Sequence, residues 1–134
     1  MESLELLRAK IREFPGYDTA LQRRRSDEYV RSYLGERLSE MAARCELSSD
    51  LQARVDALLL RVAFANPKDF NAHDVDGIPA GDDGALAGAD AATIGLADRA
   101  DAIEPAPVAA YLDEVTGALD RRDDALRAIA LKTT

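Results

Sequence analysis

The chain has 134 residues, of which 31% are charged and 5% aromatic, and its formal net charge at pH 7 is −8. This length supports one hydrophobic core, so we expect a single domain over residues 1–134. The only cysteine, Cys45, excludes an internal disulfide, a zinc knuckle and a CxxC redox pair.

The first predicted element is a short amphipathic helix over residues 2–13, which Pro15 ends. Its apolar residues at helical spacing are Leu4, Leu7 and Ile11. The tetrad FPGY that follows is typical of a type II turn, and Asp18 provides an N-cap for the next helix.

A long helix is predicted from residue 19 to about residue 46, where only Gly35 interrupts a sequence free of helix breakers. Its apolar stripe consists of Val30, Leu34, Leu38, Met41 and Cys45. We interpret Cys45 as a buried and inert thiol because it falls in this stripe. Gly35 is either a tolerated weak point or a position where another helix crosses closely.

The arginines near the start of this long helix, Arg23, Arg24 and Arg25, raise the question of nucleic acid. They are spread around a helical turn, and acidic residues four positions away compensate them, so we expect no nucleic-acid partner. We expect them instead to dock an acidic surface of a partner protein. One candidate for that surface is the segment 66–104 of a neighbouring subunit.

A third helix is predicted to begin at Ser49, which forms a capping box with Gln52, and to end before Asn66 and Pro67. Its own leucine, valine and phenylalanine residues are distributed around most of its circumference. We therefore expect this helix to be the most buried element. Its stretch ALLLRVAFA is interrupted by Arg61 and is too short to span a membrane.

Residues 66–104 contain two basic and nine acidic residues, and we expect an irregular loop to about residue 84, followed by a marginal helix. The loop sequence NAHDVDGIPAGDDG fails the EF-hand pattern at its first ligand position. A looser Ca²⁺ or Mg²⁺ site remains open, with carboxylate ligands drawn from Asp69, Asp74, Asp76, Asp82 and Asp83, and His73 is a further candidate ligand. The alternative is a solvated acidic surface loop without a cofactor.

The last helix is predicted to begin near Pro105 or Pro107, and its stripe has the 3.5-residue period of a left-handed helical bundle. The stripe consists of Val108, Leu112, Val115, Leu119, Arg122, Leu126 and Ile129. We expect Arg122 to extend along the edge of the bundle into solvent. The alternative is a paired charge inside an interface, which would need an acidic residue from a partner chain.

Motifs for catalysis are not apparent: there is no GxSxG elbow, no glycine-rich phosphate loop and no dinucleotide fingerprint. This favours a non-enzymatic protein. The four tyrosines are either residues at the edge of the core or the lining of a ligand pocket between helices. They are Tyr17, Tyr29, Tyr33 and Tyr111.

Taken together, the sequence predicts an all-α protein: a helical bundle of about four helices with a long acidic Gly/Asp-rich loop, which we expect a homodimer to complete. No export signal is visible, and Glu2 and Glu5 occupy the region where one would carry positive charge, so we expect a cytoplasmic protein. The predicted function is a protein–protein interaction module. The alternative is a protein that binds a small molecule or divalent cation through residues 69–83.

Overall fold

The computed structural model describes residues 2–64 and 84–133, which form helices and connections but no strand. The all-α prediction is confirmed for this part of the chain. The helices are α1 (Ser3–Lys10), α2 (Ala20–Cys45), α3 (Ser49–Ala63), α5 (Gly84–Arg99), the short 3₁₀ helix η1 (Ala100–Ala102) and α6 (Val108–Thr133). Among these helices, none combines the length and apolar character that a membrane crossing requires.

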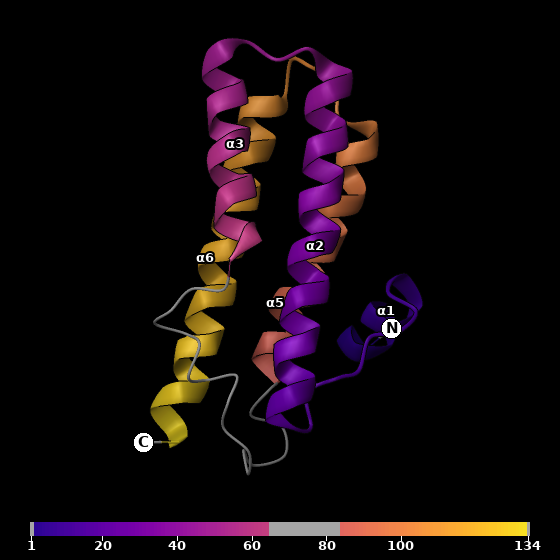
Figure 1. Ribbon diagram of the computed structural model, residues 1–134, viewed down its shortest axis with the longest axis vertical. Helices are drawn as coiled ribbons and strands as arrows, with labels where there is room; N and C mark the ends of the chain where they lie inside the picture. Colours follow the sequence, from indigo (N-terminus) through magenta and orange to yellow (C-terminus); the bar gives the residue numbers. More distant parts are fainter. Residues whose placement is uncertain (1, 65–83, 134) are drawn as a thin grey trace.

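The helices form two antiparallel pairs that lie side by side (Figure 1). α2 pairs with α3, and α5 pairs with α6; α2 also packs along α5, and α3 along α6. α1 covers α5 from the side. α5 therefore has neighbours on three sides, whereas α3 contacts α2 and α6 alone among the helices that the structure describes.

The connection from α1 to α2 turns at Gly16, whose φ of 97° is the positive value that the third position of a type II turn needs. Ser26 Oγ donates a hydrogen bond of 2.6 Å to the Gly16 carbonyl and fixes this turn against α2. The prediction that Asp18 caps α2 is wrong. Thr19 is the cap, because its hydroxyl accepts from the Gln22 backbone N–H at 3.1 Å while the Gln22 side chain accepts from the Thr19 N–H.

α2 is one continuous helix, and its predicted apolar stripe is buried. Gly35 lies where α2 meets α3: a Cβ added there would be 3.4 Å from Val62 Cγ2. That separation is an ordinary van der Waals contact. The two helices therefore approach each other at Gly35, but their crossing does not depend on a glycine.

α3 differs from its prediction in two respects. Its cap is Ser48 and not Ser49, because the Ser48 hydroxyl accepts from the Leu51 N–H. It is also not the most buried element, since Leu60 is 66% exposed and Phe64 is 69% exposed. Only the face that carries Val55, Leu58 and Val62 is buried against α2 and α6.

The helix predicted as marginal is α5, and its burial on three sides compensates for a sequence rich in alanine and glycine. α6 begins at Val108, directly after Pro107, and the apolar members of its stripe from Val108 to Leu126 are buried as predicted. The side chain of Ile129 lies outside the described residues.

The last turns of α2 and α5 are joined by Arg44. Its guanidinium donates to the carbonyls of Ala100 at 2.9 Å, Asp101 at 2.8 Å and Ile103 at 2.7 Å. The Ala100 carbonyl also accepts from the Ile103 backbone N–H at 3.4 Å, and Arg44 supplies a side-chain donor to all three carbonyls at this helix end. The neighbouring Cys45 is buried, as predicted, with its Sγ 3.5 Å from the Ile103 carbonyl.

Candidate functional site

A network of ion pairs crosses the interior between α2, α5 and α6. Arg122 of α6 donates from Nε to Oδ1 of Asp90 on α5 at 2.5 Å, and from Nη2 to Oδ1 of Asp27 on α2. The exposed fraction is 4% for Arg122, 3% for Asp27 and 0% for Asp90. A guanidinium in this position needs such partners, because an isolated buried charge is very costly.

Two further side chains complete the network. The Tyr17 hydroxyl donates to Asp90 Oδ2 at 2.6 Å, and Arg31 Nε donates to Asp27 Oδ2 at 2.9 Å. Arg31 also donates from Nη1 to the Val62 carbonyl near the end of α3. All four carboxylate oxygens of Asp27 and Asp90 thus accept a hydrogen bond, and the two acidic charges are balanced by two guanidiniums.

Burial and charge act in opposite directions on the ionisation of this network. Burial raises the pKa of Asp90, although Arg122 and the Tyr17 hydroxyl oppose the change. Burial acts to lower the pKa of Arg122, but the carboxylates of Asp90 and Asp27 outweigh it and raise that pKa above the usual value of arginine. Arg122 therefore stays charged.

The prediction that Arg122 extends into solvent is wrong, and the paired-charge alternative describes it better. Its partners come from the same chain, so this pairing needs no acidic residue from a partner chain. Sequence reasoning missed Asp90. The available signal was one acidic residue on the same face of α5 as Leu86, Ala87 and Ile94, in the way that Arg122 interrupts the stripe of α6.

The arginines predicted to dock a partner have different environments. Arg23 is 2% exposed and donates from Nη1 to the Tyr17 carbonyl at 2.9 Å. Arg24 is half-buried and Arg25 is exposed. A docking role for these residues and for Arg122 stays a prediction, and burial places Arg23 and Arg122 away from the surface.

The predicted cation ligands Asp69, His73, Asp74 and Asp76 lie outside the described residues. Within residues 2–64 and 84–133, no group of three or more His, Cys, Asp or Glu side chains is placed to hold a metal ion.

The four tyrosines do not line one pocket. Tyr17 belongs to a cluster of buried apolar residues from α1, α2, α5 and the C-terminal half of α6. Tyr111 belongs to a second cluster, formed by α2, α3, α6 and the last residues of α5 with η1. Their hydroxyls bind separate groups: Tyr17 binds Asp90, Tyr29 binds Glu13, Tyr33 binds Asp98 and Tyr111 binds the Leu96 carbonyl.

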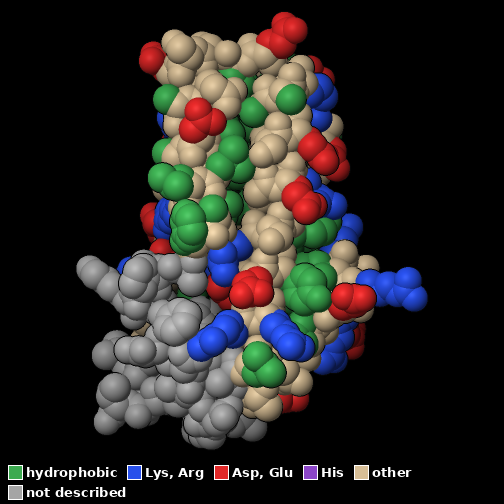
Figure 2. Space-filling view, in the orientation of Figure 1, with side chains coloured by type: hydrophobic (Ala, Val, Ile, Leu, Met, Phe, Trp, Pro, Cys, Tyr) green, Lys and Arg blue, Asp and Glu red, His purple; other side chains and the backbone are tan. Residues whose placement is uncertain are grey.

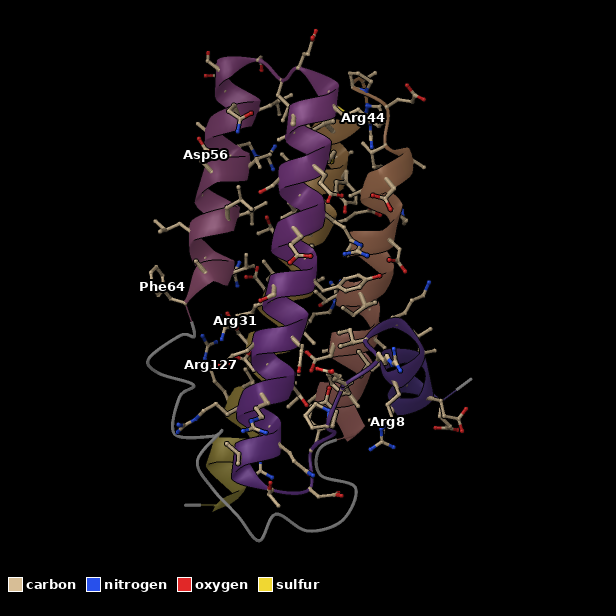
Figure 3. All side chains as sticks on the ribbon, turned by 45° about the vertical axis from the view of Figure 1, so that its right-hand side comes forward. Arg8, Arg31, Arg44, Asp56, Phe64 and Arg127 are labelled. Carbon is tan, nitrogen blue, oxygen red and sulfur yellow. The ribbon has the colours of Figure 1, made fainter. Side chains whose placement is uncertain are left out.

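The outward face of α3 carries a second set of apolar residues. Ala53, Ala57 and Leu60 are exposed and recur at intervals of four and three residues along one face of α3, and the exposed Phe64 follows them as the C-cap residue, where the backbone is extended. We call this set the outer α3 stripe. Figure 2 shows apolar side chains at the surface of α3, and in Figure 3 Phe64 points away from the neighbouring helices.

Ion pairs with α6 border the outer α3 stripe. Arg54 Nη2 lies 2.6 Å from Asp113 Oδ1, and two turns further on Arg61 Nη2 lies 2.9 Å from both Asp120 Oδ1 and Asp123 Oδ2. Asp113 and Asp120 remain 76% and 63% exposed. On the other border, a groove of about 590 Å³ runs between α2 and α3 over Gly35, Leu59 and Val62.

The buried ion network and the exposed outer α3 stripe differ in their access to partners. The ion network has its hydrogen bonds satisfied and connects elements of the fold, whereas the outer α3 stripe exposes apolar groups to solvent. Comparison of the chain with protein-family models, with curated proteins and with solved structures gives no match.

Proposed function

We propose that the protein is a cytoplasmic, non-enzymatic protein–protein interaction module, and that the outer α3 stripe is its binding surface. The observation that carries this proposal is the exposure of Leu60, at 66%, on the outward face of α3 and of Phe64, at 69%, directly after its end. A helix with apolar residues around most of its circumference normally has both faces covered. Among residues 2–64 and 84–133, α2 and α6 pack against one face of α3.

The outer α3 stripe would form the centre of a larger interface. Burial of a leucine or phenylalanine side chain contributes roughly 1.5–3 kcal/mol, so these two residues can act as the centre of an interface. A stable interface covers about 800 Å² on each partner, which is more than one stripe provides. The groove between α2 and α3 and the ion pairs along α6 supply adjoining surface on both sides.

The proposal is tested in cells that express the protein with a photoreactive phenylalanine analogue in place of Leu60, which crosslinks to a bound partner. Irradiation is expected to give a covalent protein adduct. The matched control carries the same analogue in place of Ala92, which is exposed on α5 and away from α3. No adduct at position 60, or equal adduct formation at both positions, would remove the support for this surface.

The cation-binding function predicted for residues 69–83 makes a different prediction. A ligand that binds only the folded state raises the melting temperature by mass action. Thermal melts with and without millimolar Ca²⁺ or Mg²⁺, repeated on Asp74→Asn, therefore distinguish it: a rise that the variant abolishes supports the cation site.

A further inference from the structure

We infer that the partner of the outer α3 stripe is a second copy of this chain, packed antiparallel about a two-fold axis that passes close to Ala57. This inference rests on the proposed function, because it names the partner of the same surface. It commits to one arrangement, in which the residue order along one stripe runs opposite to the order along the other.

Side-chain size increases along the outer α3 stripe. Small residues, Ala53 and Ala57, occupy the N-terminal half of the stripe, and large residues, Leu60 and Phe64, occupy the C-terminal half. Antiparallel packing about this axis places Leu60 of each copy between Ala53 and Ala57 of the other, so that large and small side chains interdigitate, while Phe64 extends past Ala53 to the level of Asp50. Parallel packing would instead set Phe64 against Phe64 and leave a gap between the alanines.

Ion pairs repeat along the border of the outer α3 stripe with α6. Arg54 and Asp113 form one rung, and Arg61 and Asp120 form the next, seven residues further along both helices. Reversal of the direction brings the first rung of one copy to the second rung of the other. Arg54 then gains a second carboxylate from the partner and Arg61 gains a third, since Asp113 and Asp120 are more than half exposed.

The same two-fold axis fixes which border lies closer to the partner. On the α2 side, the exposed Asp56 lies next to Ala57 and would face its own copy, and Glu36 and Glu40 of α2 add further negative charge on the same side. Like charges in that position oppose a close approach. The contact is therefore centred on α3 and the ion pairs of α6, and not on the groove beside α2.

Sedimentation velocity over a range of protein concentrations measures the association. The wild-type chain is expected to be a reversible dimer, and Leu60→Glu is expected to weaken the dimer at least about tenfold, because a charge would be buried in the contact. Since Leu60 is exposed, this variant keeps its fold, which its circular dichroism spectrum checks. A wild-type chain that is monomeric at every concentration overturns the inference.

Engineered cysteines test the direction of packing. Ala53→Cys mixed with Leu60→Cys is expected to oxidise mainly to the mixed disulfide, which antiparallel packing favours. The control is Ala92→Cys, and the native Cys45 adds little background because it is buried. Predominant disulfides between two Ala53→Cys chains would indicate parallel packing and overturn the arrangement.

The mass of the adduct formed at position 60 distinguishes a failure of the proposed function from a failure of the inferred homodimer. An adduct with the mass of two copies of this chain supports both the proposed function and the inference. An adduct with a different protein, together with a monomeric sedimentation profile, keeps the proposed function and overturns the inference. The absence of any adduct removes the support for both.

Discussion

Arg122 and Asp90 are joined by a hydrogen bond of 2.5 Å between two side chains that are both buried, one on α6 and one on α5. Replacement of Arg122 by methionine would leave Asp90 with only the Tyr17 hydroxyl, so we expect the free energy of unfolding to fall by about 3–5 kcal/mol. Chemical denaturation measures this loss. The control is Arg99→Met, which removes an exposed pair with Glu114 and is expected to cost at most about 1 kcal/mol. Equal losses in the two variants would show that the buried network has no special weight.

The Tyr17 hydroxyl donates to the buried carboxylate of Asp90 at 2.6 Å. Tyr17→Phe removes this donor without changing the shape of the ring. We therefore expect it to destabilise the protein by about 1.5–3 kcal/mol, the range for a hydrogen bond to a charged group. Tyr29→Phe is the matched control, because its hydroxyl bonds to Glu13 at the surface with a length of 3.3 Å. A loss in the control as large as that in Tyr17→Phe would contradict this account.

Two glycines are expected to respond in opposite directions to alanine. Gly95 is an exposed residue of α5, and a Cβ added there would meet nothing within 4 Å, so Gly95→Ala should stabilise the helix by up to about 1 kcal/mol. Gly16 has a φ of 97°, and a Cβ there would lie 3.1 Å from Arg8 Nη2. Gly16→Ala should therefore lower the melting temperature. Thermal melts of both variants provide the measurement, and a stabilised Gly16→Ala variant would exclude backbone strain at that turn.

Asp98 is expected to make stability depend on pH in the acid range. Partial burial acts to raise its pKa, but hydrogen bonds from Tyr33 and Lys10 and the charge of Arg37 outweigh it and hold the pKa below the ordinary value of 3.8. A lowered pKa means that the folded state binds the proton less tightly than the unfolded chain does. The stabilisation is therefore complete above the ordinary value and is lost as the pH falls through the lowered one.

The difference in melting temperature between wild type and Asp98→Asn measures this contribution. It is expected to be full near pH 6 and to shrink as the pH falls below the ordinary pKa of 3.8. Tyr33→Phe, which removes one hydrogen bond to Asp98, should move the acid loss to higher pH. A difference that stays constant across this pH range would show that Asp98 does not titrate with a lowered pKa.

The sequence predicted best those features that depend on regular spacing along one helix. The stripes of α2 and α6 are buried as predicted, because a period of 3.5 or 3.6 residues places their side chains on one face whatever the neighbours are. The caps were displaced by one residue. Asp18 and Thr19, like Ser48 and Ser49, are adjacent residues that can both serve as caps, and the backbone conformation decides between them.

Features that depend on distant parts of the chain were not predictable in this way. Arg122 pairs with residues 32 and 95 positions away, and only the packing of three helices brings them together. The composition of α3 predicted burial on all sides, yet burial depends on how many helices surround it, and within the described residues only two do. This error in the prediction is also what identifies the outer α3 stripe as a surface to be covered.

The three hydrogen bonds from Arg44 have a consequence for how the fold opens. They attach the final turn of α2 to the carbonyls that follow α5, so neither helix end can fray without releasing the other. The two helical pairs are thereby latched at the end where their own connecting turns lie (Figure 3). Thermal opening should begin at the opposite end, near the first turns of α2 and α5.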